Sequence, residues 1–167
     1  SVSDLSAIFA ERKRQGRKLP MIVSTAIDEK AIAKSHRGNI TSLYTSGAAN
    51  NVLGFSGDRC LLSMVSDENV FERINHILAD TDTQAKVISS IVDIAPYTPV
   101  VDEYDAEMPY YKIRLINYNN FDLNNAARIL FERHCADNSI TIERRTKFTP
   151  EMTIYRVCPD SAEQLSL

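Results

Sequence analysis

Cys60-Leu61-Leu62-Ser63-Met64-Val65 is the stretch that decides the fold, because it predicts a strand that leads directly into an amphipathic helix. Ser66 or Asp67 can cap this helix. Its apolar residues recur at the i, i+4 and i+7 spacing of one helix face, and they are Val70, Phe71, Ile74, Ile77 and Leu78. A strand joined to a one-faced helix predicts a sheet with helices packed against it.

Strands and helices alternate on both sides of this stretch. Residues 19–27 predict a strand, a short helix follows it, and residues 86–94 predict a later strand that Pro96 ends. Residues 35–58 are polar and rich in glycine, which predicts a long loop. An additional strand is expected within residues 42–55 of that loop. Together these elements predict a first unit at residues 19–96.

A second unit is predicted at residues 110–167. Residues 97–109 are acidic and contain prolines, which predicts a linker between the two units. Strands are expected at residues 111–116, 139–143 and 153–157, with a helix after the first of them. A last helix can be capped near residue 160 and has no strand behind it, which suggests a longer natural chain.

Each half therefore reads strand, helix, strand, helix, strand, with room for one more strand, although the second half lacks its final strand. This is the ferredoxin-like, or split βαβ, order. We predict an α+β fold of two ferredoxin-like units, with antiparallel sheets and helices on one face. Residues 1–18 predict an N-terminal helix with a basic end. Those cations either complement the helix dipole or form a docking patch for an acidic partner.

The composition is that of a globular protein. The chain of 167 residues is 44% hydrophobic and 25% charged, with a net charge of -3, so it offers no global attraction to nucleic acid or to an anionic membrane. No apolar run approaches the roughly 20 residues of a membrane span. Cys60, Cys135 and Cys158 are widely spaced, which argues against a disulfide framework or a zinc site. We expect a cytoplasmic protein without a metal or cofactor.

Several short stretches resemble the region in front of the catalytic domain in bacterial subtilisin-like serine proteases. They are Met21-Ile22-Val23, Ala31-Ile32-Ala33-Lys34-Ser35-His36-Arg37, Leu61-Leu62-Ser63-Met64-Val65, Ile88-Ser89-Ser90-Ile91-Val92-Asp93-Ile94-Ala95-Pro96, Tyr111-Lys112-Ile113-Arg114-Leu115 and Leu123-Asn124-Asn125. They occur in this order and cover nearly the whole chain after Lys18. The family more often carries proline where this chain has Gly38.

The resemblance implies a non-catalytic prodomain or N-terminal regulatory region. Such regions fold against the protease domain, assist its folding and block its active site. The open face of their sheet packs on protease helices, and the C-terminal tail, here with Leu165 and Leu167, lies in the substrate cleft. The chain lacks the glycine-rich Asp, His and Ser motifs of the subtilisin triad, so we expect no protease activity from it.

The candidate contact residues fall into two groups. Lys34, His36 and Arg37 form a basic cluster that is either a contact site or a helix C-cap. If Tyr111 and its alternate neighbours face the core, the open face of the second sheet shows Lys112, Arg114 and Arg156. That predicts a basic surface for an acidic protein partner.

Two alternatives share the ferredoxin-like order. RNA-recognition domains stack bases on aromatic residues of two central strands, whereas the expected open face here is basic and not aromatic. A tandem ferredoxin-like module can also bind a small ligand between its units, but the sequence marks no ligand pocket. Both alternatives remain open from the sequence alone.

Overall fold

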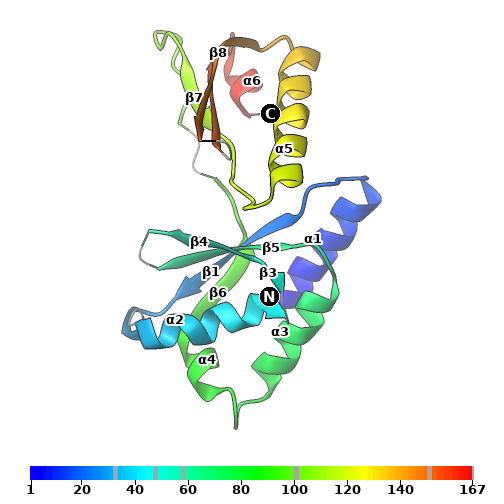
Figure 1. The fold of residues 1–167 in the computed structure, drawn as a ribbon, viewed down its shortest axis with the longest axis vertical. Coiled ribbons are helices and arrows are strands. Elements are labelled where there is room, and N and C mark those ends of the chain that lie inside the picture. Colours follow the sequence, from blue (N-terminus) through cyan, green and yellow to red (C-terminus); the bar gives the residue numbers. More distant parts are fainter. Residues whose placement is uncertain (32–33, 47–48, 58, 100–101, 150–151, 167) are drawn as a thin grey trace. The chain divides into compact units, whose positions relative to one another are not determined.

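The computed structural model describes residues 1–31, 34–46, 49–57, 59–99, 102–149 and 152–166. The chain divides into two compact units, Ser1–Thr98 and Pro99–Leu167. Each unit combines helices with one main antiparallel sheet, of four strands in unit 1 and three in unit 2 (Figure 1). The mixed α+β class expected from the sequence is therefore confirmed. Within the described ranges, no helix is long and apolar enough to cross a membrane.

The main sheet of unit 1 has the strand order β4-β5-β1-β6, and every neighbouring pair is antiparallel. The strands are β1 (Met21–Ile27), β4 (Val52–Ser56), β5 (Cys60–Val65) and β6 (Ile91–Pro96). A separate two-stranded ladder joins β2 (Thr45–Ser46) to β3 (Ala49–Asn50). The strand expected within residues 42–55 corresponds to β4 at the edge of the main sheet.

The helices of unit 1 bury their apolar residues against one face of this sheet. They are α1 (Val2–Arg14), η1 (Glu29–Ala31), α2 (Lys34–Thr41), η2 (Ser42–Tyr44), α3 (Asn69–Ala79) and α4 (Ala85–Ser90). Leu5, Ile40, Phe71 and Ile74 share a single core with Val23 of β1. Figure 1 shows α2 and α3 gathered on one side of the strands. The apolar stripe expected on α3 is confirmed, since all five of its residues lie in or against this core.

The alternation of β1 separates the two faces of the sheet. Met21, Val23, Thr25 and Ile27 are buried, whereas the residues between them are half-buried. The Thr25 and Tyr44 hydroxyls lie 2.5 Å apart and share a hydrogen bond inside the core. Successive side chains of a strand point to opposite faces, so the even-numbered positions of β1 face away from the helices.

Unit 2 has the strand order β7-β9-β8, again antiparallel throughout. Its elements are β7 (Tyr111–Arg114), α5 (Phe121–Asp137), β8 (Thr141–Thr149), β9 (Met152–Cys158) and α6 (Ala162–Ser166). The Asn120 side chain caps α5 by accepting a hydrogen bond from the Leu123 amide at 3.0 Å. Tyr111, Tyr155 and Val157 form the buried centre, and α5 runs alongside the sheet (Figure 1).

Two predicted elements differ from the structure. The loop expected at residues 35–58 contains α2, η2 and three short strands. Among the residues of this region whose burial is described, Ile40, Leu43 and Tyr44 are fully buried, and α2 carries too few apolar residues to show a helical period. The strand expected from residue 86 begins at Ile91, because the preceding residues form α4. Short apolar runs do not distinguish helix from strand by periodicity.

The acidic segment expected as a linker is partly bonded to unit 2. The Tyr104 and Tyr111 rings stack with centroids 6.5 Å apart, and the Tyr104 hydroxyl donates to the Asp160 carbonyl at 3.1 Å. The Tyr111 hydroxyl also accepts from the Asp105 amide at 2.6 Å. These bonds attach residues 103–105 to the second core.

Candidate docking faces

Three residues predicted as a contact surface lie together on one face of the unit 2 sheet. Lys112 of β7 is paired with Arg156 of β9, and Arg114 follows Lys112 on the same side of its strand. Tyr155, which precedes Arg156 in β9, points to the opposite face, where it is fully buried. The face that carries the three cations is therefore the one opposite α5.

A fourth cation, Arg144 of β8, completes this surface and was missed by the sequence reasoning. Arg144 is paired with Arg156, so the register places Lys112, Arg156 and Arg144 in one row across three strands. The register of β8 shifts between Ile142 and Arg144, where Glu143 is the extra residue. Simple alternation from Ile142 would have placed Arg144 on the buried side. We call Lys112, Arg114, Arg144 and Arg156 the basic face.

The basic face has little charge compensation. The Arg156 guanidinium lies 3.9 Å from the Glu143 carboxylate and 3.8 Å from the centre of the Tyr110 ring. Lys112, Arg114 and Arg144 are exposed, and none of them pairs with a carboxylate in the described ranges. Like charges directly opposite each other on a sheet destabilise it. The row therefore carries positive charge that is largely uncompensated within the described residues and that an acidic partner can neutralise.

The covered side of the same sheet is fixed by Glu132 of α5. Its carboxylate accepts from Arg145 at 2.8 Å and from the Tyr155 hydroxyl at 2.9 Å, and it lies 3.4 Å from Arg128. The hydrogen bond from Arg145 is the main cause that lowers the pKa of Glu132 below its usual value. Burial, followed by the bond to Glu132, raises the pKa of Tyr155. These contacts hold α5 on this side and leave the basic face uncovered by it.

Unit 1 has an open face of a different character. Ile22 is paired with Met64, Ser24 lies between Leu62 and Ala95, and Ala26 is paired with Cys60. These side chains are half-buried and lie on the face opposite the helices, where the exposed Asp93 of β6 is also paired with Ala26. We call Ile22, Ala26, Leu62, Met64 and Ala95 the apolar face. An apolar surface of this kind is typical of protein–protein contacts.

The other predicted contact residues belong to α2 and to the C-terminal end of the chain. The backbone of Lys34, His36 and Arg37 belongs to α2, but their side chains lie outside the part of the chain that the structure describes. Leu165 of α6 packs against the core of unit 2, so its side chain is not free in a tail. Leu167 lies outside the described residues.

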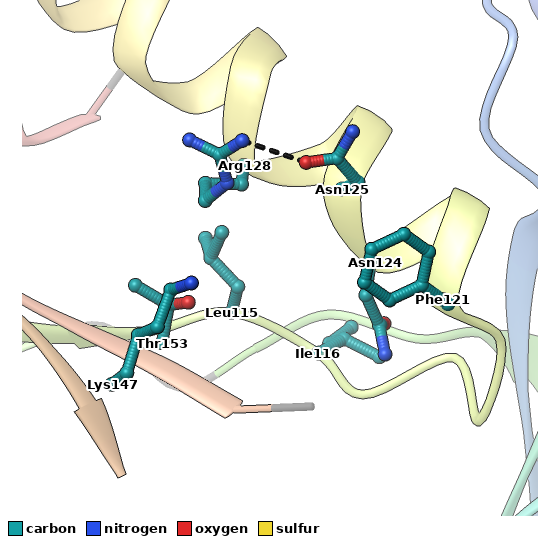
Figure 2. Close-up of a pocket in the computed structure, with 8 residues that line it drawn as sticks. All are labelled: Leu115, Ile116, Phe121, Asn124, Asn125, Arg128, Lys147 and Thr153. Atoms are coloured by element: carbon teal, nitrogen blue, oxygen red, sulfur yellow. Dashed lines mark hydrogen bonds between the residues drawn. The ribbon is translucent and has the colours of Figure 1, made fainter. Parts of the chain in front are cut away.

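A small pocket lies beside the first turns of α5 (Figure 2). It has a volume of about 90 Å³ and is lined by Leu115, Ile116, Phe121, Asn124, Asn125, Arg128, Lys147 and Thr153. Arg128 donates to the Asn125 side chain at 2.6 Å, so one of its two cations is already bonded (Figure 2). Ligand pockets usually exceed about 300 Å³, so this one suits a group of a few atoms.

No group of three or more His, Cys, Asp or Glu residues in the described ranges is placed to hold a metal ion. Cys60, Cys135 and Cys158 are free thiols, and burial raises the pKa of Cys135. The open faces of the two main sheets are therefore the candidate functional surfaces.

No protein-family model, curated protein or solved structure matches the chain.

Proposed function

We propose that the chain is a non-catalytic docking module, a prodomain or N-terminal regulatory region of a subtilisin-like serine protease. The observation that carries this proposal is the apolar face of unit 1, which lies opposite the helices at the centre of a four-stranded sheet. In the family that the sequence resembles, the equivalent open face packs on helices of the protease. The module acts by stoichiometric binding that assists folding of the protease or blocks its active site.

Each unit is proposed to be a ferredoxin-like split βαβ unit. In unit 1, β5 lies between β1 and β4 although it follows both of them in the chain, and β6 lies beside β1. In unit 2, β9 lies between β7 and β8 in the same way. A later strand inserted between two strands that flank a helix is the defining feature of the split βαβ arrangement.

The two alternatives have less support. On the open side of β7 and β9, the basic-face residues Lys112, Arg114 and Arg156 lie with Ile154, and one face of the neighbouring Tyr110 ring is covered by a guanidinium. Base recognition on such a sheet uses free aromatic rings. The pocket beside α5 is small for a metabolite. Three free thiols also suit a reducing cytoplasm, the compartment in which this module is proposed to act.

A cleavage assay tests the docking function. The chain is mixed with a purified bacterial subtilisin-like protease domain, and hydrolysis of a chromogenic peptide is followed against the molar ratio. We expect inhibition that saturates near one module per protease. No inhibition and no complex by size-exclusion chromatography would remove the proposal.

Matched variants locate the contact. Leu62→Lys places a charge on the apolar face and is expected to weaken inhibition at least about tenfold. Ser24→Arg adds bulk at the centre of the same face without removing an apolar side chain, so it tests the surface if Leu62→Lys folds poorly. Ile8→Lys introduces the same charge at an exposed position of α1 and is expected to leave inhibition unchanged.

A further inference from the structure

The basic face of unit 2 is an unusual arrangement for a chain with a net charge of -3. Four cations lie on it, and among the described residues the carboxylate that pairs with one of them is Glu143, which lies 3.9 Å from Arg156. Lys112, Arg156 and Arg144 stand directly across from one another on adjacent strands. Opposed like charges cost stability, so a sheet selected for stability alone would not be expected to keep three in a row.

The geometry of the row selects a shape of partner. Neighbouring strands lie about 4.8 Å apart, so the three cations span about 10 Å at right angles to the strands. Acidic residues at positions i, i+4 and i+7 of an α-helix share one face and span about 10.5 Å along the helix axis. A helix laid across β7, β9 and β8 can therefore bring one carboxylate to each cation.

The Arg156 side chain is restrained by an aromatic ring before any partner binds. Its guanidinium carbon lies 3.8 Å from the centre of the Tyr110 ring, and this cation–π contact restrains the side chain. A guanidinium fixed in this way loses less side-chain freedom when it binds a carboxylate. The same contact covers one face of the Tyr110 ring, so the ring is poorly placed to stack on a nucleic-acid base.

We propose that the basic face binds an acidic α-helix of a protein partner, with carboxylates spaced at i, i+4 and i+7 over Lys112, Arg156 and Arg144. This inference rests on the proposed docking function and names the chemistry of a second contact, made by unit 2. The apolar face of unit 1 and the basic face of unit 2 are thus two contact surfaces of different character.

The test uses the full chain and a synthetic probe. The probe is a fluorescein-labelled, alanine-based helical peptide of about 18 residues with Glu at i, i+4 and i+7, and binding is followed by fluorescence anisotropy. We expect binding that weakens as salt rises from about 50 to 300 mM. The matching peptide with Gln in place of Glu is expected to bind at least about tenfold more weakly.

Charge-reversal variants identify the surface. Arg144→Glu is expected to weaken peptide binding about tenfold, because it removes one contact and adds a repulsive charge. Arg133→Glu is the matched control, since Arg133 is exposed on α5 and makes the same charge change away from the basic face. Equal binding by wild type and Arg144→Glu would overturn the inference. Tighter binding of a single-stranded oligouridine of about 12 nucleotides than of the acidic peptide would also overturn it, in favour of nucleic acid.

The peptide assay and the protease assay fail independently. Lost peptide binding with intact protease inhibition removes the acidic-helix partner and leaves the docking function in place. Intact peptide binding without any protease complex removes the proposed function, because the basic face would then serve another acidic partner.

Discussion

Removing one hydroxyl, in Tyr155→Phe, is expected to destabilise unit 2 and leave unit 1 unchanged. The Tyr155 side chain is fully buried, its ring centre lies 4.7 Å from that of Phe131, and its hydroxyl donates to Glu132 at 2.9 Å. A hydrogen bond to a charged group contributes about 1.5–3 kcal/mol. The Glu132 carboxylate keeps its bond from Arg145, so we expect a loss near the lower value, about 1.5 kcal/mol.

This loss is measured by urea unfolding followed with amide NMR signals. Signals from α3 report on unit 1 and signals from α5 report on unit 2, so the two units are followed separately. For a unit of this size the same loss lowers the unfolding temperature by about 6–12 °C. Tyr110→Phe is the matched control, since it keeps the ring beneath Arg156 and removes a hydroxyl that bonds to no described residue. A change in unit 2 below about 0.5 kcal/mol, or an equal change in α3, would refute the assigned bond and the separation of the cores.

Three further predictions concern stability. Glu132 has a lowered pKa in the folded chain, so the stability that it contributes is present above pH 4.5 and is lost as the pH falls through the lowered pKa. Glu132→Gln should therefore reduce the loss of stability in acid, measured by urea unfolding at a series of pH values. Burial raises the pKa of Tyr44 to about 12 from 10.0. The stability that its neutral hydroxyl contributes is therefore present below pH 10 and is lost as the pH rises through about 12. Tyr44→Phe should reduce this alkaline loss of stability, followed by circular dichroism. Gly57→Ala should cost about 1 kcal/mol because φ is +66°, whereas Gly38→Ala in α2 has open space around the new methyl group and should gain about 0.5–1 kcal/mol, both measured as urea midpoints.

The sequence predicted best where one local pattern and burial agree. The strand at β5 and the helix α3 were predicted together, because the apolar residues from Val70 to Leu78 follow one helical face. The antiparallel sheets were predicted from the order of strands and helices, and the position of Lys112, Arg114 and Arg156 opposite the core was predicted from strand alternation.

Prediction failed where tertiary contacts select the structure. The helix α2 contains few apolar residues, and it is stabilised in part by packing of Ile40 in the core. The end of the same region is fixed by Arg73 of α3, which donates to the Leu43 carbonyl at 2.7 Å over a separation of 30 residues. Neither contact leaves a periodic signal in the local sequence.

A single inserted residue in β8 is the reason that the sequence did not predict Arg144 as part of the basic face. Two adjacent arginines on a strand should point to opposite sides, and Arg145 does turn inward to bind Glu132. Counting from Ile142 without the bulge at Glu143 assigns the two arginines to the wrong sides. Register cannot be read from one strand, because it is set by the partner strand β9.

Hydrogen exchange with and without a subtilisin-like protease domain tests most directly whether the open sheet faces are docking surfaces. We expect slower amide exchange in β1 and β5 on complex formation, with α1 and α3 unchanged because they lie on the covered side of the sheet. Protection confined to the helices, or identical exchange with and without the protease, would contradict the account.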